Sequence, residues 1–227
     1  MKLLLTSGGI TNPSILNALV HLLDKPIEEC KALCIPTAGY AIPNGIDYAW
    51  SFISGQEESH MCDLGWKRVG VLELTALPSI PREIWEPKLR ETDVLLVNGG
   101  DPLYLNHWMK ESGVAELLPS LNLVYVGLSA GSMIMAPRIG EIFVNWKQPT
   151  KDDTTLGLVD FSIFPHLDHI KLPENTLETA DDWAATIQGT SYAIDDATAI
   201  IVVDGNVQIV SEGKWKQYDY DQVEKRC

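Results

Sequence analysis

Short apolar segments that alternate with helical patterns constrain the fold of this chain more than any other feature. Five such segments are predicted as strands: Lys2–Thr6, residues 32–35, residues 69–72, Val94–Val97 and residues 123–126. Strands without polar positions are typical of a parallel sheet that helices cover on both faces. Near the end of the chain, Asp204-Gly205 separates two further apolar runs, and this dipeptide suits the type I′ turn of a β-hairpin. The sequence therefore predicts a doubly wound, mostly parallel α/β sheet with a C-terminal β-hairpin.

Helices are expected between these strands. Asn12 and Pro13 suit the cap and the first position of a helix over residues 15–23. Further helices are predicted within residues 48–53, 82–92 and 103–110, whereas residues 142–144 look like a strand. No linker divides the chain, so residues 1–227 are predicted to form one domain, with residues 217–227 as a loose polar tail.

Charge and hydropathy exclude several classes of partner. The 227 residues carry a net charge of −14 without a cluster of Lys and Arg, which argues against nucleic acid and anionic membranes. No apolar stretch approaches the roughly 18 residues of a membrane span, and the apolar run at the start is too short for a signal peptide. A cytoplasmic protein is expected. The four cysteines lack the spacing of metal ligands, so neither a metal nor another cofactor is expected.

The pentapeptide Gly127-Leu128-Ser129-Ala130-Gly131 is the strongest functional signal. It follows an apolar strand and precedes a second apolar stretch, and G-x-S-x-G between a strand and a helix is the pattern of a nucleophile elbow. The glycines allow the sharp turn that such an elbow needs. Ser129 is therefore the predicted nucleophile, and a tight turn with a bystander serine is the alternative.

A serine nucleophile needs a base, and His166 is the best placed of the five histidines. It follows the strand-like Phe161–Phe164 and Pro165, and sites in open α/β sheets gather at the carboxyl ends of strands. His169, in the same loop, is the nearest rival. The oxyanion hole is assigned to the N–H groups of Ala130 and of Gly100, which belongs to the loop Asn98-Gly99-Gly100-Asp101-Pro102. A plain strand-to-helix turn is the alternative for that loop.

The acid that should orient the histidine is the least defined member of the predicted site. Glu141 follows the elbow helix closely and is the first choice. Asp160 and Asp168 are nearer to His166 in the sequence and stay open as alternatives.

Together these motifs resemble the peptidase E (aspartyl dipeptidase) family, whose wider group includes the cyanophycinases. The resemblance rests on Asn98-Gly99-Gly100, on residues 127–131 and on Phe164-Pro165-His166, with a spacing of 37 positions from Ser129 to His166. It implies a fold like the class I glutamine amidotransferases, with a flavodoxin-like core and a serine where those enzymes carry cysteine. It also implies a metal-free cytoplasmic exopeptidase that releases an N-terminal aspartate from short peptides.

The chain departs from that family at the position expected to hold the substrate. Ala180 aligns where an arginine would bind the aspartate side chain of the substrate, so specificity for aspartate is left open. The prediction is thus a serine exopeptidase or dipeptidase that acts on small peptides through an acyl-enzyme. One alternative is a homologue that has lost activity and acts in sensing or binding. The other is an esterase with the same elbow, although the chain has no histidine after His169. A homodimer is left open.

Overall fold

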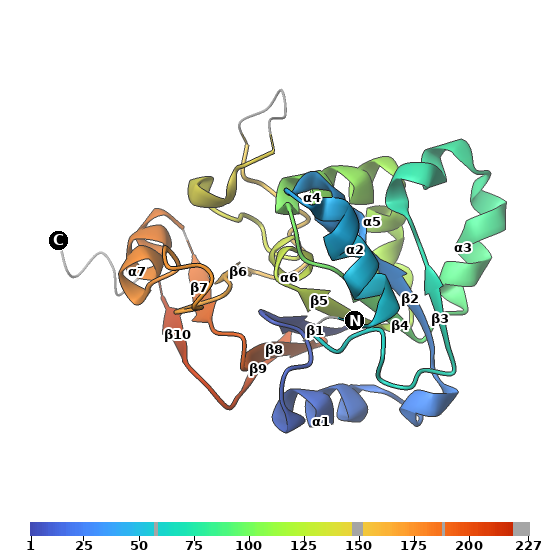
Figure 1. Ribbon diagram of the computed structural model, residues 1–227, viewed down its shortest axis with the longest axis horizontal. Coiled ribbons are helices and arrows are strands. Elements are labelled where there is room, and N and C mark those ends of the chain that lie inside the picture. The colour runs from blue at the N-terminus through green and yellow to red at the C-terminus, as the bar shows by residue number, and fades with distance from the viewer. Residues whose placement is uncertain (57–58, 147–151, 188, 220–227) are drawn as a thin grey trace.

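The computed structural model describes residues 1–56, 59–146, 152–187 and 189–219. Within them, seven strands form the main sheet in the order β3-β2-β4-β5-β1-β8-β9 (Figure 1). The strands are β1 (Lys2–Thr6), β2 (Lys31–Ile35), β3 (Arg68–Val71), β4 (Val94–Val97), β5 (Val124–Leu128), β8 (Thr198–Val203) and β9 (Asn206–Ser211). Strands β1 to β5 run parallel, β8 pairs antiparallel with β1, and β9 pairs antiparallel with β8. The predicted mostly parallel α/β sheet is confirmed.

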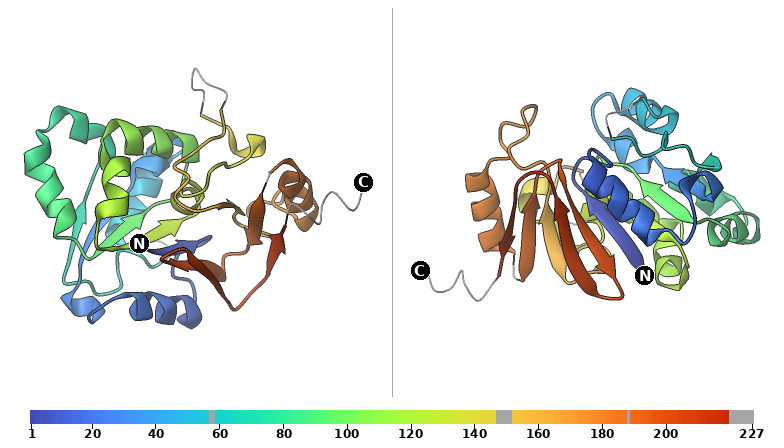
Figure 2. Two further views of the ribbon diagram at one scale, coloured as in Figure 1. Left: turned by 180° about the vertical axis from the view of Figure 1, so that it is seen from behind. Right: turned by 90° about the horizontal axis from the view of Figure 1, so that it is seen from below.

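Helices cover both faces of this sheet because successive side chains of a strand point to opposite faces (Figure 2). Leu3 and Leu5 join the core beneath α3, α4, α5 and α6, whereas Leu4 joins the core beneath α1 and α2. The helices are α1 (Pro13–Leu22), α2 (Gly45–Ser54), α3 (Arg82–Arg90), α4 (Pro102–Glu111), α5 (Val114–Leu117) and α6 (Ala130–Met133). The sheet is therefore doubly wound.

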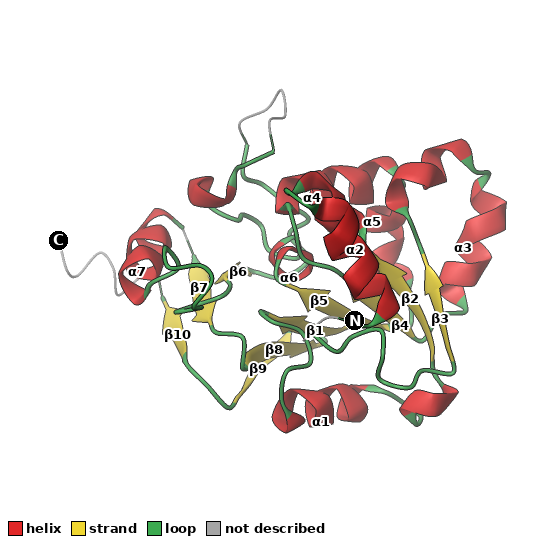
Figure 3. Ribbon diagram, viewed as in Figure 1, coloured by secondary structure: helices red, strands yellow, loops and turns green. Residues whose placement is uncertain are grey.

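A second sheet, which the sequence analysis did not predict, lies beside β8 and β9 (Figures 1 and 3). It has the strand order β10-β7-β6. Its strands are β6 (Phe161–Phe164), β7 (Thr190–Ile194) and β10 (Trp215–Tyr218), and α7 (Leu177–Thr186) packs on it. Residues 217–218 thus belong to a strand rather than to the predicted loose tail, of which residues 220–227 lie outside the described part of the chain.

Local signals in the sequence account for several details. The Asn12 side chain accepts a hydrogen bond from the Ile15 N–H at 2.9 Å and caps α1 as predicted. Asp204 and Gly205 both have positive φ, which a type I′ turn requires, and the predicted hairpin is confirmed as β8 and β9.

Residues 142–144 differ from their prediction as a strand. Glu141–Phe143 forms a 3₁₀ turn, and Phe143 and Val144 pack on α4 and α6 instead of pairing with a strand. None of the helices in the described ranges has the length and apolar character needed to cross a membrane.

Candidate active site

Ser129 lies in a strained turn at the carboxyl end of β5. Its φ of 48° and ψ of −109° are rare for a residue with a side chain. A Cβ at Gly127 would lie 2.7 Å from the backbone of Gly131, and one at Gly131 would clash with the Val97 carbonyl, so both glycines are required. The Ser129 N–H donates to the Thr6 carbonyl of β1 at 3.0 Å. Ser129 thus lies at a sharp turn between a strand and a helix, which only glycine allows at positions 127 and 131.

The loop after β4 approaches this elbow closely. A Cβ built on Gly99 would lie 3.3 Å from the Ser129 Cβ, and one on Gly100 would clash with the Ala38 carbonyl. Gly100 also has a φ of 132°, which favours glycine. Within the described residues, the N–H groups of Gly100 and Ala130 donate to no acceptor. Two backbone donors next to the serine are therefore available to a ligand.

His166 follows β6 and lines the same cleft as Ser129. Its Nδ1 lies 2.7 Å from Oδ1 of Asp196, which follows β7. A carboxylate accepts hydrogen bonds, so this contact places the proton of a neutral imidazole on Nδ1. The Nε2 atom of His166 is then the one that can take up a proton.

The carboxylate beside His166 therefore belongs to Asp196 and not to Glu141. Glu141 begins the 3₁₀ turn over Glu141–Phe143, and its side chain is exposed. Asp168, one of the alternatives, forms an ion pair with Lys214 at 3.0 Å. The sequence offered a signal for Asp196, because the strand-like run over Thr190–Ile194 comes just before it.

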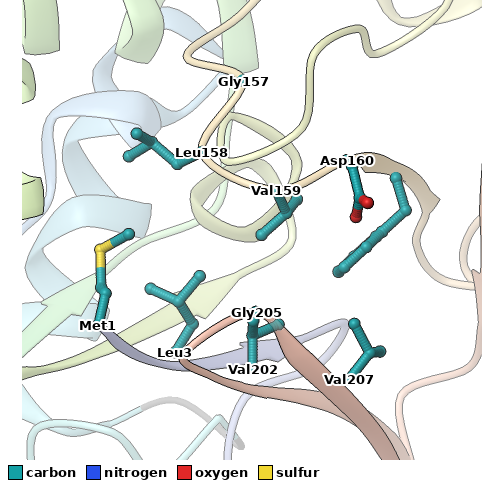
Figure 4. Close-up of a pocket in the computed structure, with 10 residues that line it drawn as sticks. Met1, Leu3, Gly157, Leu158, Val159, Asp160, Val202, Gly205 and Val207 are labelled. Atoms are coloured by element: carbon teal, nitrogen blue, oxygen red, sulfur yellow. The ribbon is translucent and has the colours of Figure 1, made fainter.

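Asp160, the other alternative, precedes β6, whereas His166 follows it. It lines a separate pocket of about 340 Å³, together with Met1, Leu3 and Val202 (Figure 4). Met1 and Leu3 belong to the beginning of the chain and of β1, whereas Ser129 lies at the carboxyl end of β5, with which β1 pairs in parallel. Asp160 thus lies at the opposite end of the strands from Ser129.

Ser7, directly after β1, connects His166 and Asp196. Its hydroxyl donates to Asp196 Oδ1 at 2.7 Å and accepts the His166 backbone N–H at 2.7 Å. A hydroxyl has one proton, so these two bonds fix its orientation. The side chain of Ser7 is buried, and the sequence analysis did not identify it.

His169 binds the other oxygen of the same carboxylate. Its Nε2 lies 3.4 Å from Asp196 Oδ2, and its Nδ1 accepts the Lys171 N–H at 3.2 Å. Burial alone would raise the pKa of Asp196, but the hydrogen bond and charge of His166, the Ser7 hydroxyl and the charge of His169 together hold this pKa below its ordinary value. The carboxylate is thus kept ionised between two imidazoles.

Ser129 and His166 line one open cleft of about 1180 Å³. Other lining residues come from α2 and the loop before it, the loop before α4, α6, the 3₁₀ turn over Glu141–Phe143 and the residues after it, the loop after β6 and the start of α7. They include Ile42, Tyr48, Gly100, Asp101, Met133, Phe143, Trp146, His169, Lys171, Leu172, Glu174 and Thr179. Ala180 is not among them, because it is 0% exposed and packs with Phe164 and Trp183. Among the described residues, no group of three or more His, Cys, Asp or Glu side chains could hold a metal ion.

Comparisons with known proteins agree with this fold. The chain is 30% identical to an uncharacterised peptidase of Pasteurella multocida over 122 residues, which are 51% of this chain and 58% of the relative. It is also 30% identical to an uncharacterised peptidase of Listeria monocytogenes over 124 residues, with the same two shares. The chain thus matches less than two thirds of the length of these curated relatives.

Two solved structures share the fold. One is a provisionally assigned peptidase E of Listeria monocytogenes, with a TM-score of 0.66, 21% identity and coverage of 93% of this chain and 98% of that one. The other is a peptidase of an acI-B1 actinobacterium, with a TM-score of 0.62, 19% identity and coverage of 96% and 93%. The sequence profile of peptidase family S51 matches residues 3–210. The chain therefore belongs to peptidase family S51.

Proposed function

We propose that this protein is a serine-type exopeptidase that hydrolyses short peptides, with Ser129 as nucleophile, His166 as base and Asp196 as the orienting acid. The observation that carries the proposal is the strained Ser129 turn in the same cleft as the hydrogen-bonded His166–Asp196 pair. Membership of a peptidase family supports the same chemistry.

The reaction follows from the positions of these groups. Ser129 Oγ attacks the scissile carbonyl while His166 Nε2 takes its proton, and Asp196 stabilises the imidazolium that forms. The N–H groups of Gly100 and Ala130 bind the negative oxygen of the tetrahedral intermediate. His166 then protonates the leaving amine, and water hydrolyses the acyl-enzyme with the same histidine as base.

The size of the cleft favours short substrates. A volume of about 1180 Å³ is somewhat above the usual range of roughly 300–1,000 Å³ for small-ligand pockets, and it fits a peptide of a few residues.

Covalent labelling tests the proposal directly. A fluorophosphonate should label the wild-type protein at Ser129, and Ser129→Ala and His166→Ala should abolish labelling and the hydrolysis of dipeptides. His60→Ala is the matched control, because His60 is exposed and binds Asp63 in another part of the chain. Undiminished labelling of His166→Ala, or none of the wild type, would contradict the proposed mechanism.

A further inference from the structure

We infer that the active-site cleft selects peptides with apolar side chains and disfavours acidic ones. This inference rests on the proposed function, whose substrate class it names. Three independent features of the cleft support it: its wall, its rim and its charge.

The wall next to the nucleophile is apolar. Phe143 and Trp146 pack against a buried group that contains Met133, and all three residues line the cleft. Met133 lies four residues after Ser129, which is about one helical turn, so the apolar surface begins beside the reacting serine. Such a wall binds an aliphatic or aromatic side chain by removing its surface from water.

Asp101 holds this wall in place. Its carboxylate accepts the backbone N–H of Tyr104 at 2.9 Å and also that of Trp146. Asp101 follows Gly100 directly, so one side chain connects the predicted oxyanion donor to the apolar wall. Because Asp101 is buried and occupied by these backbone groups, it serves the wall rather than the substrate.

The rim of the cleft carries an apolar side chain that packing within the chain does not explain. Ile142 lines the cleft and is 52% exposed. An exposed apolar side chain in the lining of a cleft is available to an apolar ligand.

The charge of the cleft opposes an acidic side chain. Among the described residues that line it, Lys171 is the sole lysine or arginine, and the Glu174 carboxylate lies in the same loop. The Ala180 position faces the interior, so it could not present a cation to the substrate. The chain carries a net charge of −14, and this charge repels the side-chain carboxylate of an acidic substrate.

A matched set of dipeptides tests the inference on the wild-type protein. Leu–Leu, Asn–Leu and Asp–Leu differ at the first side chain, and Asn–Leu has the shape of Asp–Leu without its charge. We expect kcat/KM to fall in that order, with a difference of roughly tenfold or more between Leu–Leu and Asp–Leu. Equal or faster cleavage of Asp–Leu would overturn the inference.

A charge introduced at the rim should change this preference. Ile142→Lys is expected to raise the ratio of kcat/KM for Asp–Leu over Leu–Leu by roughly tenfold, because a lysine would attract the carboxylate and remove apolar contact. Ile84→Lys is the matched control, since Ile84 is 61% exposed on α3 and does not line the cleft. An unchanged ratio in Ile142→Lys would show that the rim at Ile142 does not contact the substrate and would overturn the inference.

Binding to the Ser129→Ala variant separates this inference from the proposed chemistry. Calorimetry should show tighter binding of Leu–Leu than of Asp–Leu even though the variant cannot hydrolyse either. Tighter Leu–Leu binding without fluorophosphonate labelling of the wild type would retain the inference and refute the serine mechanism. If Ser129 of the wild type is labelled but the variant binds Asp–Leu more tightly, or binds neither dipeptide, the serine mechanism is retained and the inference is refuted.

Discussion

Replacing Asp196 by asparagine should reduce turnover far more than replacing Glu141 by glutamine. In the structure the Ser7 hydroxyl and His166 Nδ1 both bind Oδ1 of Asp196, and Nε2 of His169 lies 3.4 Å from Oδ2. An asparagine offers one acceptor oxygen and one donor group, so one or more of these donors would face a second donor. If the amide nitrogen faces His166, the imidazole must carry its proton on Nε2 and cannot act as a base.

The expected loss is large. The same substitution in a serine-protease triad lowers kcat by roughly 10⁴-fold, which corresponds to about 5.4 kcal/mol of transition-state stabilisation. Asp196 has two additional partners, and the change would also disturb its hydrogen bond with Ser7 and its ion pair with His169. Glu141 is exposed, so Glu141→Gln should leave kcat within a factor of about two.

The assay compares kcat of both variants on one dipeptide, with circular dichroism spectra to show that each is folded. A folded Asp196→Asn protein that keeps more than a tenth of wild-type kcat would refute the reasoning. A folded Glu141→Gln protein with a loss of several thousandfold would refute it as well, and would restore Glu141 as the acid.

Three further predictions concern the oxyanion loop, the α7 interior and acid stability. Gly100→Ala should lower kcat by roughly 10²- to 10³-fold because its Cβ would displace the loop. Gly65→Ala is the control, since Gly65 also has a positive φ but lies in open space, and it should leave kcat unchanged. Equal kcat values for the two variants would contradict this prediction. Ala180→Arg should strongly lower the urea concentration at the midpoint of unfolding, because it buries a charge. Thr179→Arg, at a half-buried position, should be tolerated. Similar midpoints for the two variants would show that α7 can turn this face outward. Because the pKa of Asp196 is lowered in the folded protein, this group stabilises the fold at a pH above its unfolded pKa of about 3.9, and the stabilisation is lost as the pH falls through the lowered pKa. Thermal unfolding from pH 6 to 3 should therefore show a steeper fall in Tm for the wild type than for Asp196→Asn. Parallel curves would contradict that linkage.

The features that the sequence predicts well are those encoded within a few residues. The elbow around Ser129 is a strand, a turn and a helix in direct succession, and both glycines are required by contacts of the turn itself. His166 follows the same logic, since a strand and a proline precede it. Gly100 is part of a strand-to-helix connection of the same local kind.

Asp196 was missed because its position depends on pairing between distant strands. Strands β6 and β7 are parallel, with Phe164 opposite Ala193. His166 and Asp196 lie two and three residues beyond that pair, and the common end of the two strands brings them together. No signal within a few residues predicts the second sheet, and Glu141 is the acidic residue that follows the Ser129 turn closely along the chain.

The end of β1 has a mechanical consequence for the enzyme. The Thr6 carbonyl accepts the Ser129 N–H of the main sheet, and the next residue, Ser7, binds both His166 and Asp196 of the second sheet. The end of β1 therefore connects Ser129, the nucleophile of the proposed mechanism, to the His166–Asp196 pair that would transfer protons in it. Phe161 and Tyr192 of the second sheet pack in the same core as Leu3 of β1, so this shared core sets how the two sheets lie against each other. A small rotation of the second sheet would separate Ser129 from His166. The catalytic rate should therefore depend strongly on the relative position of the two sheets. Activity should disappear at a lower urea concentration than helical structure does.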